Sequence, residues 1–295
     1  MKLRFWGVRG SIATPGPDTV RYGGNTTCLE IRADDGSLII LDGGTGIHRA
    51  ALSLLQDMPI NAHIFLTHTH WDHIQGLPFF VPIFVPGNSI TLHGPFDPVS
   101  GNGVEQVMAI QMQYSFFPVR ESELRAGIAY RSLMPGEAVR VGDAIVTPVL
   151  LNHPVVNYGY RIDCNGKSLF FTGDHEPHTN IYAPEDESHA AFQEMVDNQR
   201  GEIERALAGV DVLVADTSYT PEEYACKKGW GHGTYDSAIA LARAVGAKTL
   251  FCTHHEPTRS DDALEAAFAA ALERTDAAAG SVRIQLAAEG LTLEW

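Results

Sequence analysis

The stretch AHIFLTHTHWDHIQG, Ala62–Gly76, joins a short apolar run to three histidines and an aspartate within six positions. The run has the length and composition of a buried strand, and side chains two apart on a strand share a face. His68 and His70 therefore share a face at the strand end, and Asp72 and His73 follow where the chain turns toward a helix. Imidazoles and carboxylates suit Zn²⁺, or Mn²⁺ and Fe²⁺ with more oxygen ligands. The pattern predicts two metal ions side by side rather than a solvated polar loop.

A two-metal site needs more ligands than these four, and later apolar runs carry suitable residues at their ends. TPVLLNHP ends a predicted strand at His153, and SLFFTGD ends one at Asp174. KTLFCTHH ends one at His254 and His255, which point to opposite faces. In a layered α/β fold, strand ends can bring ligands from distant parts of the sequence to one edge. The sequence predicts such an edge here.

Predicted strands and helices follow one another along the whole chain, separated by short turns rich in Gly and Pro. Strands are expected at 2–8, 27–32, 37–42, 62–67, 89–95, 129–133, 137–141, 144–151, 157–163, 168–174, 211–217, 248–255 and 283–287, and helices at 44–57, 103–113, 191–207, 234–246 and 262–275. Strand-rich segments with helices in both halves predict a layered α/β sandwich with helices outside two sheets. No linker or repeat divides the chain, so we expect one domain over 1–295, with a helical and aromatic insert at about 95–125.

Charge and composition narrow the possible partners. The chain has 21 Lys and Arg against 36 Asp and Glu, a net charge of −15. Long nucleic acids are therefore not expected as partners, because their binding depends on phosphate neutralisation. The four cysteines form no CxxC pair, the first residues lack the apolar stretch of a signal peptide, and no apolar run approaches membrane-spanning length. These features predict a cytoplasmic protein without membrane contact.

The order of HxHxDH, a lone later His, a GD Asp and a late TH His resembles that of the metallo-β-lactamase-fold hydrolases, over essentially the whole chain. The resemblance implies a four-layer αββα sandwich and two divalent metal ions, Zn or Mn with Fe possible. It implies that one ion is held by His68, His70 and His153, the second by Asp72, His73 and His254, and that Asp174 bridges them. His254 is preferred to His255 because the family's ligand follows the strand directly.

A second segment indicates which branch of this family the chain resembles. KGWGHGTYDSAIALARAVGAK, Lys228–Lys248, is similar to the Gly-His-Ser/Thr segment of the phosphodiesterase branch. That branch includes cyclic-phosphate phosphodiesterases and tRNA 3′-end endonucleases. His232 would contact a phosphate oxygen or protonate the leaving alkoxide, unless it only caps a helix or packs in the core. Asp72 is the second expected catalytic residue, orienting a hydroxide between the metals, and Asp216 is expected either to support a ligand or His232, or to sit in a cap or turn.

Three substrate classes remain open. They are small cyclic nucleotides or cyclic phosphates, the 3′ ends of tRNA precursors, and the esters of a lactonase, arylesterase or organophosphate hydrolase. The tRNA endonucleases hold tRNA with a basic, Gly-rich arm, whereas the segment 95–125 is mostly apolar. We therefore expect a small phosphodiester substrate. Four residues of this segment would stack a base, pack against a second subunit of a homodimer, or join the core: Tyr114, Phe116, Phe117 and Pro118.

Six further histidines stand outside this ligand set. His48, His63 and His93 are expected to be packed or surface groups, whereas His175 and His178 are expected in a loop near the rim of the site. His189 has no predicted role.

Overall fold

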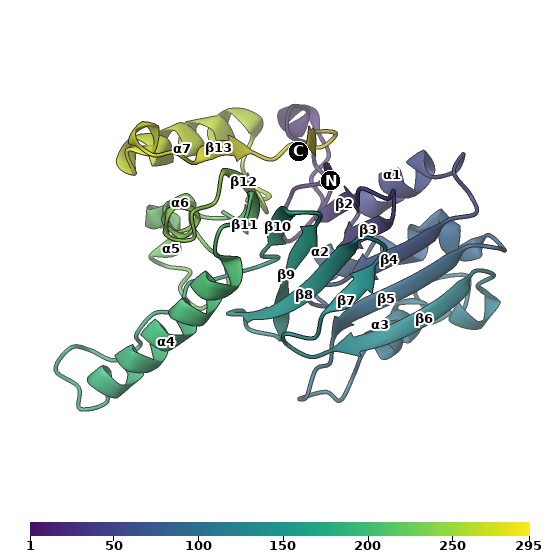
Figure 1. Cartoon of the computed structure of the whole chain (residues 1–295), viewed down its shortest axis with the longest axis horizontal. Helices are drawn as coiled ribbons and strands as arrows, with labels where there is room; N and C mark the ends of the chain where they lie inside the picture. The colour runs from purple at the N-terminus through teal and green to yellow at the C-terminus, as the bar shows by residue number, and fades with distance from the viewer.

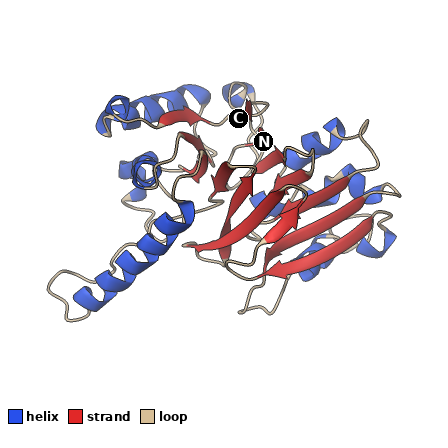
Figure 2. Cartoon of the chain, in the orientation of Figure 1, coloured by secondary structure: helices blue, strands red, loops and turns tan.

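Two seven-stranded sheets lie against each other, and helices cover their outer faces (Figure 1). The computed structural model describes the backbone of residues 1–295 and every side chain except that of Ala279. Figure 2 shows the same arrangement with helices in blue on the outside of the red strands. The predicted four-layer αββα sandwich is therefore confirmed.

The first sheet has the order β14-β1-β2-β3-β4-β5-β6 and the second has the order β13-β12-β11-β10-β9-β8-β7. The first consists of β1 Lys2–Gly7, β2 Cys28–Arg32, β3 Leu38–Leu41, β4 Asn61–Phe65, β5 Ser89–Pro95, β6 Gly127–Leu133 and β14 Thr292–Glu294. The second consists of β7 Val139–Val141, β8 Ala144–Leu151, β9 Asn157–Cys164, β10 Lys167–Phe171, β11 Val212–Asp216, β12 Thr249–Thr253 and β13 Arg283–Leu286.

The α-helices are α1 Gly46–Ser53, α2 Trp71–Ile74, α3 Val104–Gln111, α4 His189–Leu207, α5 Pro221–Tyr224, α6 Tyr235–Ala244 and α7 Asp261–Arg274. All thirteen predicted strands and all five predicted helices are present. The helix expected where the chain turns at Asp72 and His73 is present as α2, whereas the short elements β14 and α5 were not expected from the sequence. Their three or four residues are too few to show a periodic pattern. Among the described residues, no helix is both long and apolar enough to cross a membrane.

Three apolar clusters hold the four layers together. The central cluster lies between the sheets and includes Phe5 and Phe65 from the first sheet and Phe171 and Phe251 from the second. A second cluster packs α1 and α3 on the first sheet, and a third packs α4, α6 and α7 on the second. Removing these side chains from water is the main stabilising contribution to such a fold.

The strand directions place the candidate ligands at one edge. Strands β3 to β6 run parallel in the first sheet, and β10 to β13 run parallel in the second. Carboxyl ends of parallel neighbours lie at the same edge of a sheet, where open α/β folds place their sites. His68 follows the end of β4, Asp174 follows β10 and His254 follows β12.

The segment between β5 and β6 is a helical crossover between two neighbouring parallel strands. Its helix, α3, packs on the first sheet through Val104 and Met108. Of its predicted aromatic loop, Tyr114 and Phe116 are exposed, whereas Phe117 is partly buried against Phe79. The loop thus divides between solvent and core.

Candidate metal centre

The seven predicted metal ligands come together at the edge formed by these strand ends. The first group consists of His68, His70, His153 and Asp174, and the second group consists of Asp72, His73, Asp174 and His254. Within each group, the possible ligand atoms all lie within 4.8 Å of one another. His255 takes no part, because its Nε2 donates to the Ala287 carbonyl at 2.9 Å in the core.

Asp174 divides its two carboxylate oxygens between the groups. Its Oδ2 lies 3.5 Å from Nε2 of His68 and 3.9 Å from Nε2 of His153. Its Oδ1 lies 3.2 Å from Nε2 of His73 and 3.1 Å from Nε2 of His254. One buried carboxylate therefore faces both sets of imidazoles, as a bridging ligand would.

The remaining ligand atoms of each group also lie close to one another. In the first, Nδ1 of His70 lies 3.1 Å from Nε2 of His153. In the second, Oδ2 of Asp72 lies 3.1 Å from Nε2 of His254 and 3.3 Å from Nε2 of His73. The backbone N–H of Ser11 donates to that same Asp72 oxygen at 2.7 Å, which holds the carboxylate in place.

The outer ring nitrogens of four imidazoles contact other protein groups. Nδ1 of His73 lies 2.7 Å from Oδ2 of Asp42, and Nδ1 of His254 lies 2.9 Å from Oγ of Ser218. Nδ1 of His153 donates to the Gly231 carbonyl at 2.9 Å, and Nδ1 of His68 lies 3.0 Å from Oγ1 of Thr67. Such contacts set the tautomer and orientation of a metal-ligating imidazole.

Sequence reasoning missed Asp42 and Ser218. Asp42 follows the apolar run LIIL directly, the same signal that identified His153 and Asp174, so it could have been found. Ser218 carries no such signal, because its contact with His254 joins residues 36 positions apart.

Three non-glycine residues at the site have left-handed backbone. The φ angles are 61° at Ser11, 61° at Asp42 and 57° at His254. This conformation is costly for most side chains and concentrates at functional sites. His254 belongs to the second group, and Ser11 donates to Asp72 of that group. The strained backbone therefore occurs at residues that set the direction of the ligand atoms.

The centre has the features of a cation site. Nε2 of His68, Nε2 of His73 and Oδ1 of Asp174 are buried and have no hydrogen-bond partner. Buried polar atoms are normally satisfied, and these converge from several elements. Five imidazoles and two carboxylates form the nitrogen and oxygen donor set that suits Zn²⁺, Mn²⁺ or Fe²⁺. These residues fit two divalent ions that share Asp174.

Charges inside the centre shift its pKa values in opposite directions. Burial lowers the pKa of His68 well below its ordinary value. Burial acts in the same direction on His73, but Asp174, Asp72 and Asp42 outweigh it and raise the pKa of that imidazole. The carboxylates thus favour positive charge at the second group. A metal ion there would compete with protons for the same ligand atoms.

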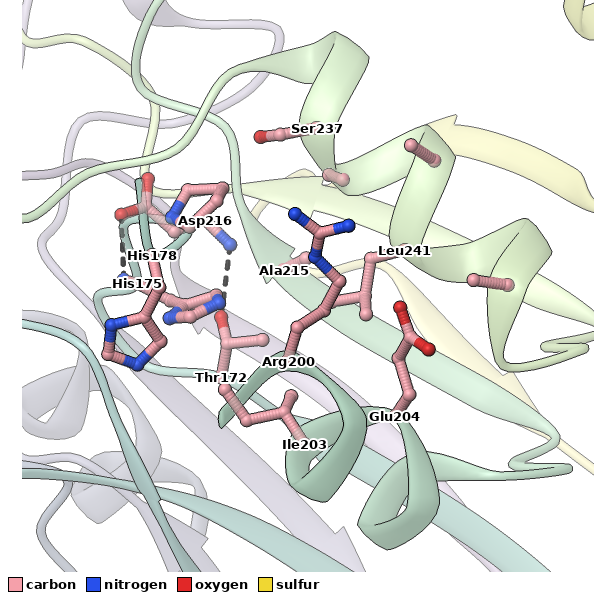
Figure 3. Close-up of a pocket in the computed structure, with 14 residues that line it drawn as sticks. Thr172, His175, His178, Arg200, Ile203, Glu204, Ala215, Asp216, Ser237 and Leu241 are labelled. Atoms are coloured by element: carbon pink, nitrogen blue, oxygen red, sulfur yellow. Dashed lines mark hydrogen bonds between the residues drawn. The ribbon is translucent and has the colours of Figure 1, made fainter. Parts of the chain in front are cut away.

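His232 lies beside the second group with its own carboxylate partner. Its Nδ1 lies 2.9 Å from Oδ2 of Asp216, as expected if Asp216 supports His232, while Oδ1 of Asp216 accepts from the Ser218 backbone N–H at 3.0 Å, as expected of a turn residue. Burial lowers the pKa of His232, yet Asp216 and Asp174 outweigh it and raise that pKa to about 9. In Figure 3, Asp216 lies beside His175, whose backbone N–H donates to the same Oδ2 at 3.2 Å.

Glu176 holds the loop that precedes His232. Its carboxylate accepts from the backbone N–H groups of Gly229 and Gly231, both at 2.8 Å, and from the Tyr224 hydroxyl at 2.7 Å. The Gly231 backbone is left-handed with φ 88°, and a Cβ there would lie 2.2 Å from Nδ1 of His153. Glu176, which the sequence analysis did not single out, thereby positions the carbonyl that orients His153.

The other histidines lie outside both groups. His48 is exposed on α1, and His63 pairs with buried His93, 3.0 Å apart. His175 and His178 line a cavity of about 300 Å³ between α4 and α6 (Figure 3). His189 begins α4.

Among curated proteins, this chain is similar in sequence to several named ribonuclease Z. Ribonuclease Z of Haloarcula marismortui is 25% identical over 86% of each chain. A ribonuclease Z of Kineococcus radiotolerans is 29% identical over a shorter stretch, 44% of this chain and 39% of that protein.

Solved structures with the same fold cover nearly the whole chain. The metallo-beta-lactamase fold protein YhfI from Bacillus subtilis has a TM-score of 0.67 at 17% identity and covers 99% of both chains. A diphosphatase from the PhnP family has a TM-score of 0.64 at 22% identity, covering 100% of this chain and 97% of that one. The family model of the beta-lactamase superfamily domain matches residues 38–255, which include all seven residues of the two groups. The chain therefore belongs to the beta-lactamase superfamily and has the hydrolase fold of its metal-dependent members.

Proposed function

We propose that this protein is a two-metal phosphodiesterase that hydrolyses small cyclic nucleotides or cyclic phosphates. The observation that carries the proposal is the division of the Asp174 oxygens between two groups of imidazoles, with His232 beside them. When bound, two divalent ions at these groups supply charge neutralisation for the phosphodiester and activation of water. His68, His70 and His153 would hold one ion, Asp72, His73 and His254 the other, and Asp174 both.

His232 would act on the leaving group. Asp216 accepts from its Nδ1, which leaves Nε2 as the nitrogen that can face a substrate. A pKa of about 9 keeps this imidazole protonated at neutral pH, so Nε2–H can donate to a phosphate oxygen or to the departing alkoxide. The side chain of His232 is 13% exposed, whereas those of Asp174 and Asp216 are almost fully buried, so it is within reach of a ligand.

Asp72 would orient the attacking water. Its Oδ2 is held by the Ser11 N–H and lies against two imidazoles, so the carboxylate cannot rotate freely. Burial acts to raise the pKa of Asp72, but His73 and His254 outweigh it, and the group stays ionised as an acceptor. An acceptor of fixed direction suits the alignment of a nucleophile.

The second candidate is the processing of tRNA 3′ ends, favoured by the similarity to ribonuclease Z of Haloarcula marismortui. The charge of the element that projects most from the body opposes it. The loop 177–188 and α4 extend away from the sheets (Figure 1) and carry seven acidic and two basic residues over 177–207. Glu185, Asp186 and Glu187 at its outer end are all exposed. Such an element repels a polyanion instead of holding it.

A substrate panel tests the proposal against this alternative and against the other ester hydrolases. The panel holds 3′,5′- and 2′,3′-cyclic nucleotides, bis(p-nitrophenyl) phosphate, a lactone and a tRNA precursor, each with Mn²⁺ or Zn²⁺. We expect hydrolysis of cyclic phosphodiesters and of bis(p-nitrophenyl) phosphate. Specific cleavage of the tRNA precursor with inert cyclic nucleotides would contradict the proposal, and preference for the lactone would assign the site to another ester class.

His232→Ala tests the role of the proton donor. We expect turnover of cyclic nucleotides to fall roughly 10²–10⁴-fold, the scale of a lost general acid. Hydrolysis of bis(p-nitrophenyl) phosphate should fall much less, because its leaving group needs little protonation. Elemental analysis serves as the control, since both ions should remain bound. Equal losses on the two substrates would assign His232 to phosphate binding, and full activity on both would leave it a structural role.

A further inference from the structure

An aromatic cavity of about 370 Å³ lies between α2 and α3, beside the segment 68–73 that carries four of the predicted metal ligands. Its walls include Thr69 and Trp71 from that loop, Phe79 after α2, Gln111 at the end of α3, and Phe116 and Phe117 from the following loop. The volume falls within the range of small-molecule pockets. Three of its aromatic side chains are largely exposed, at 76% for Trp71, 69% for Phe116 and 54% for Phe79.

The cavity and the candidate metal centre are formed in part by the same loop. Thr69 and Trp71 alternate in sequence with His70 and Asp72, one from each group of the centre. The same short loop therefore presents ligands to the centre and walls to the cavity. A molecule whose phosphate lies at the centre could place an attached group in the cavity.

The chemistry of the walls selects a neutral, planar group. Among the side chains that the structure describes, no charged one lines this cavity, so the phosphate itself has no partner there. Gln111 donates from Nε2 to the Ile74 carbonyl at 3.0 Å, which fixes its amide, while its Oε1 has no hydrogen-bond partner. Aromatic faces with a spare amide acceptor match a ring that stacks and carries N–H donors.

We propose that this cavity is the subsite for the nucleobase, or an equivalent neutral aromatic ring, of the phosphodiester substrate. The proposal rests on the proposed phosphodiesterase function and adds to it the place where the base of a nucleotide substrate binds. The base stacks on Phe116 and Trp71 while its phosphodiester reaches the metal centre. The exposed aromatic side chains are then covered by the substrate, which accounts for their place on the surface of this acidic protein.

Two matched variants and two matched substrates test the subsite. Phe116→Ala removes a wall, whereas Tyr114→Ala removes an aromatic side chain of equal exposure, 69%, that does not line the cavity. Thymidine 5′-(p-nitrophenyl) phosphate carries a base, methyl p-nitrophenyl phosphate does not, and both release p-nitrophenolate. We expect Phe116→Ala to lower kcat/KM for the thymidine ester roughly 5–100-fold, the scale of one stacked base. The methyl ester should change less than about twofold, and Tyr114→Ala should leave both unchanged.

Thymidine binding to the purified protein, followed by saturation-transfer NMR, gives a readout that does not depend on hydrolysis. We expect binding to wild type and to Tyr114→Ala, and its loss in Phe116→Ala. Hydrolysis of both esters with no selective effect of Phe116→Ala would overturn the subsite and leave the phosphodiesterase function standing. If neither ester is hydrolysed, the substrate panel with cyclic nucleotides decides the proposed function, and thymidine binding decides the subsite: Phe116-dependent binding keeps the aromatic site, and its absence overturns it.

Discussion

Asp174 is the residue whose carboxylate faces both groups of the candidate centre. It is buried, and five imidazole nitrogens, including Nδ1 of His232, lie within 4 Å of its two oxygens. Burial acts to raise the pKa of Asp174, but the surrounding imidazoles, His254 and His73 foremost, lower it well below its ordinary value. Gly173 before it is left-handed at φ 57°, and a Cβ there would meet the Thr67 side chain at 2.7 Å. The position of the carboxylate is therefore set by the backbone.

We expect Asp174→Ala to lose both metal ions together, because one carboxylate serves both groups. Elemental analysis of protein purified without chelator measures the content, with two ions per chain expected in wild type. Asp163→Ala is the control, since among the described side chains Asp163 pairs only with Arg161 on β9, away from the centre. Retention of one ion in Asp174→Ala would show that Asp174 is a terminal ligand.

At the scale of the elements, the loop between α5 and α6 depends on Glu176. This loop supplies the Gly231 carbonyl to His153 and leads directly into His232. Three donors converge on the Glu176 carboxylate, and all of them come from α5 or the loop after it. Glu176, which follows β10, thus holds the loop before α6 in place through hydrogen bonds.

Glu176→Gln should weaken metal binding at the first group about 10–100-fold, the usual effect of losing support for a ligand. A glutamine offers one acceptor oxygen, and its NH₂ would face a backbone N–H. Competition with a coloured chelator measures the affinity. Glu222→Gln, on the exposed face of α5, should leave the affinity unchanged. A lower melting temperature with unchanged metal affinity would limit Glu176 to a structural role.

The burial of His93 on β5 makes stability depend on pH. Burial, with a smaller contribution from His63, lowers the pKa of His93 to about 3, against about 6.5 in the unfolded chain. Between these values the unfolded chain binds more protons, so the free energy of unfolding falls as pH falls from about 6.5 toward 3. His93→Gln should reduce that slope by up to about 1.4 kcal/mol per pH unit. Urea unfolding from pH 4 to 7 measures it, with exposed His48→Gln as the control; an unchanged slope in His93→Gln would refute the assignment.

At the scale of the whole molecule, the candidate metal centre combines residues that follow strands of both sheets. His68 to His73 follow β4 of the first sheet, whereas His153, Asp174 and His254 follow strands of the second. Ions held by both sets would bind the folded chain and not the unfolded one. Such binding stabilises the fold by about 2.7 kcal/mol at a free metal concentration 100 times Kd.

Removal of the metals by a chelator should therefore lower the melting temperature by several degrees, and added Zn²⁺ or Mn²⁺ should restore it. Differential scanning calorimetry gives the shift. In Asp174→Ala the chelator should have no effect, because that variant has no ions to lose. An equal shift in wild type and variant would mean that the chelator acts elsewhere.

The sequence by itself determined the layered fold and the identity of the candidate ligands. An apolar run ending in His or Asp reveals both a strand and the residue at its tip, and His153 and Asp174 were found in this way. These signals lie within a few residues of one another. The resemblance to a known family then supplied the pairing of the ligands, and His254 was preferred to His255 on that basis.

Only the tertiary structure decided how the ligands are held. The contact of Asp42 with His73 spans 31 positions, and that of Glu176 with Gly231 spans 55. The pairing of β14 with β1 joins opposite ends of the chain. The two faces of Asp174 and the left-handed backbone at His254 likewise appear only when strands of both sheets meet. Such contacts form between residues that are far apart in the sequence and close in space. A pattern among neighbouring residues cannot predict them, because it contains only local information.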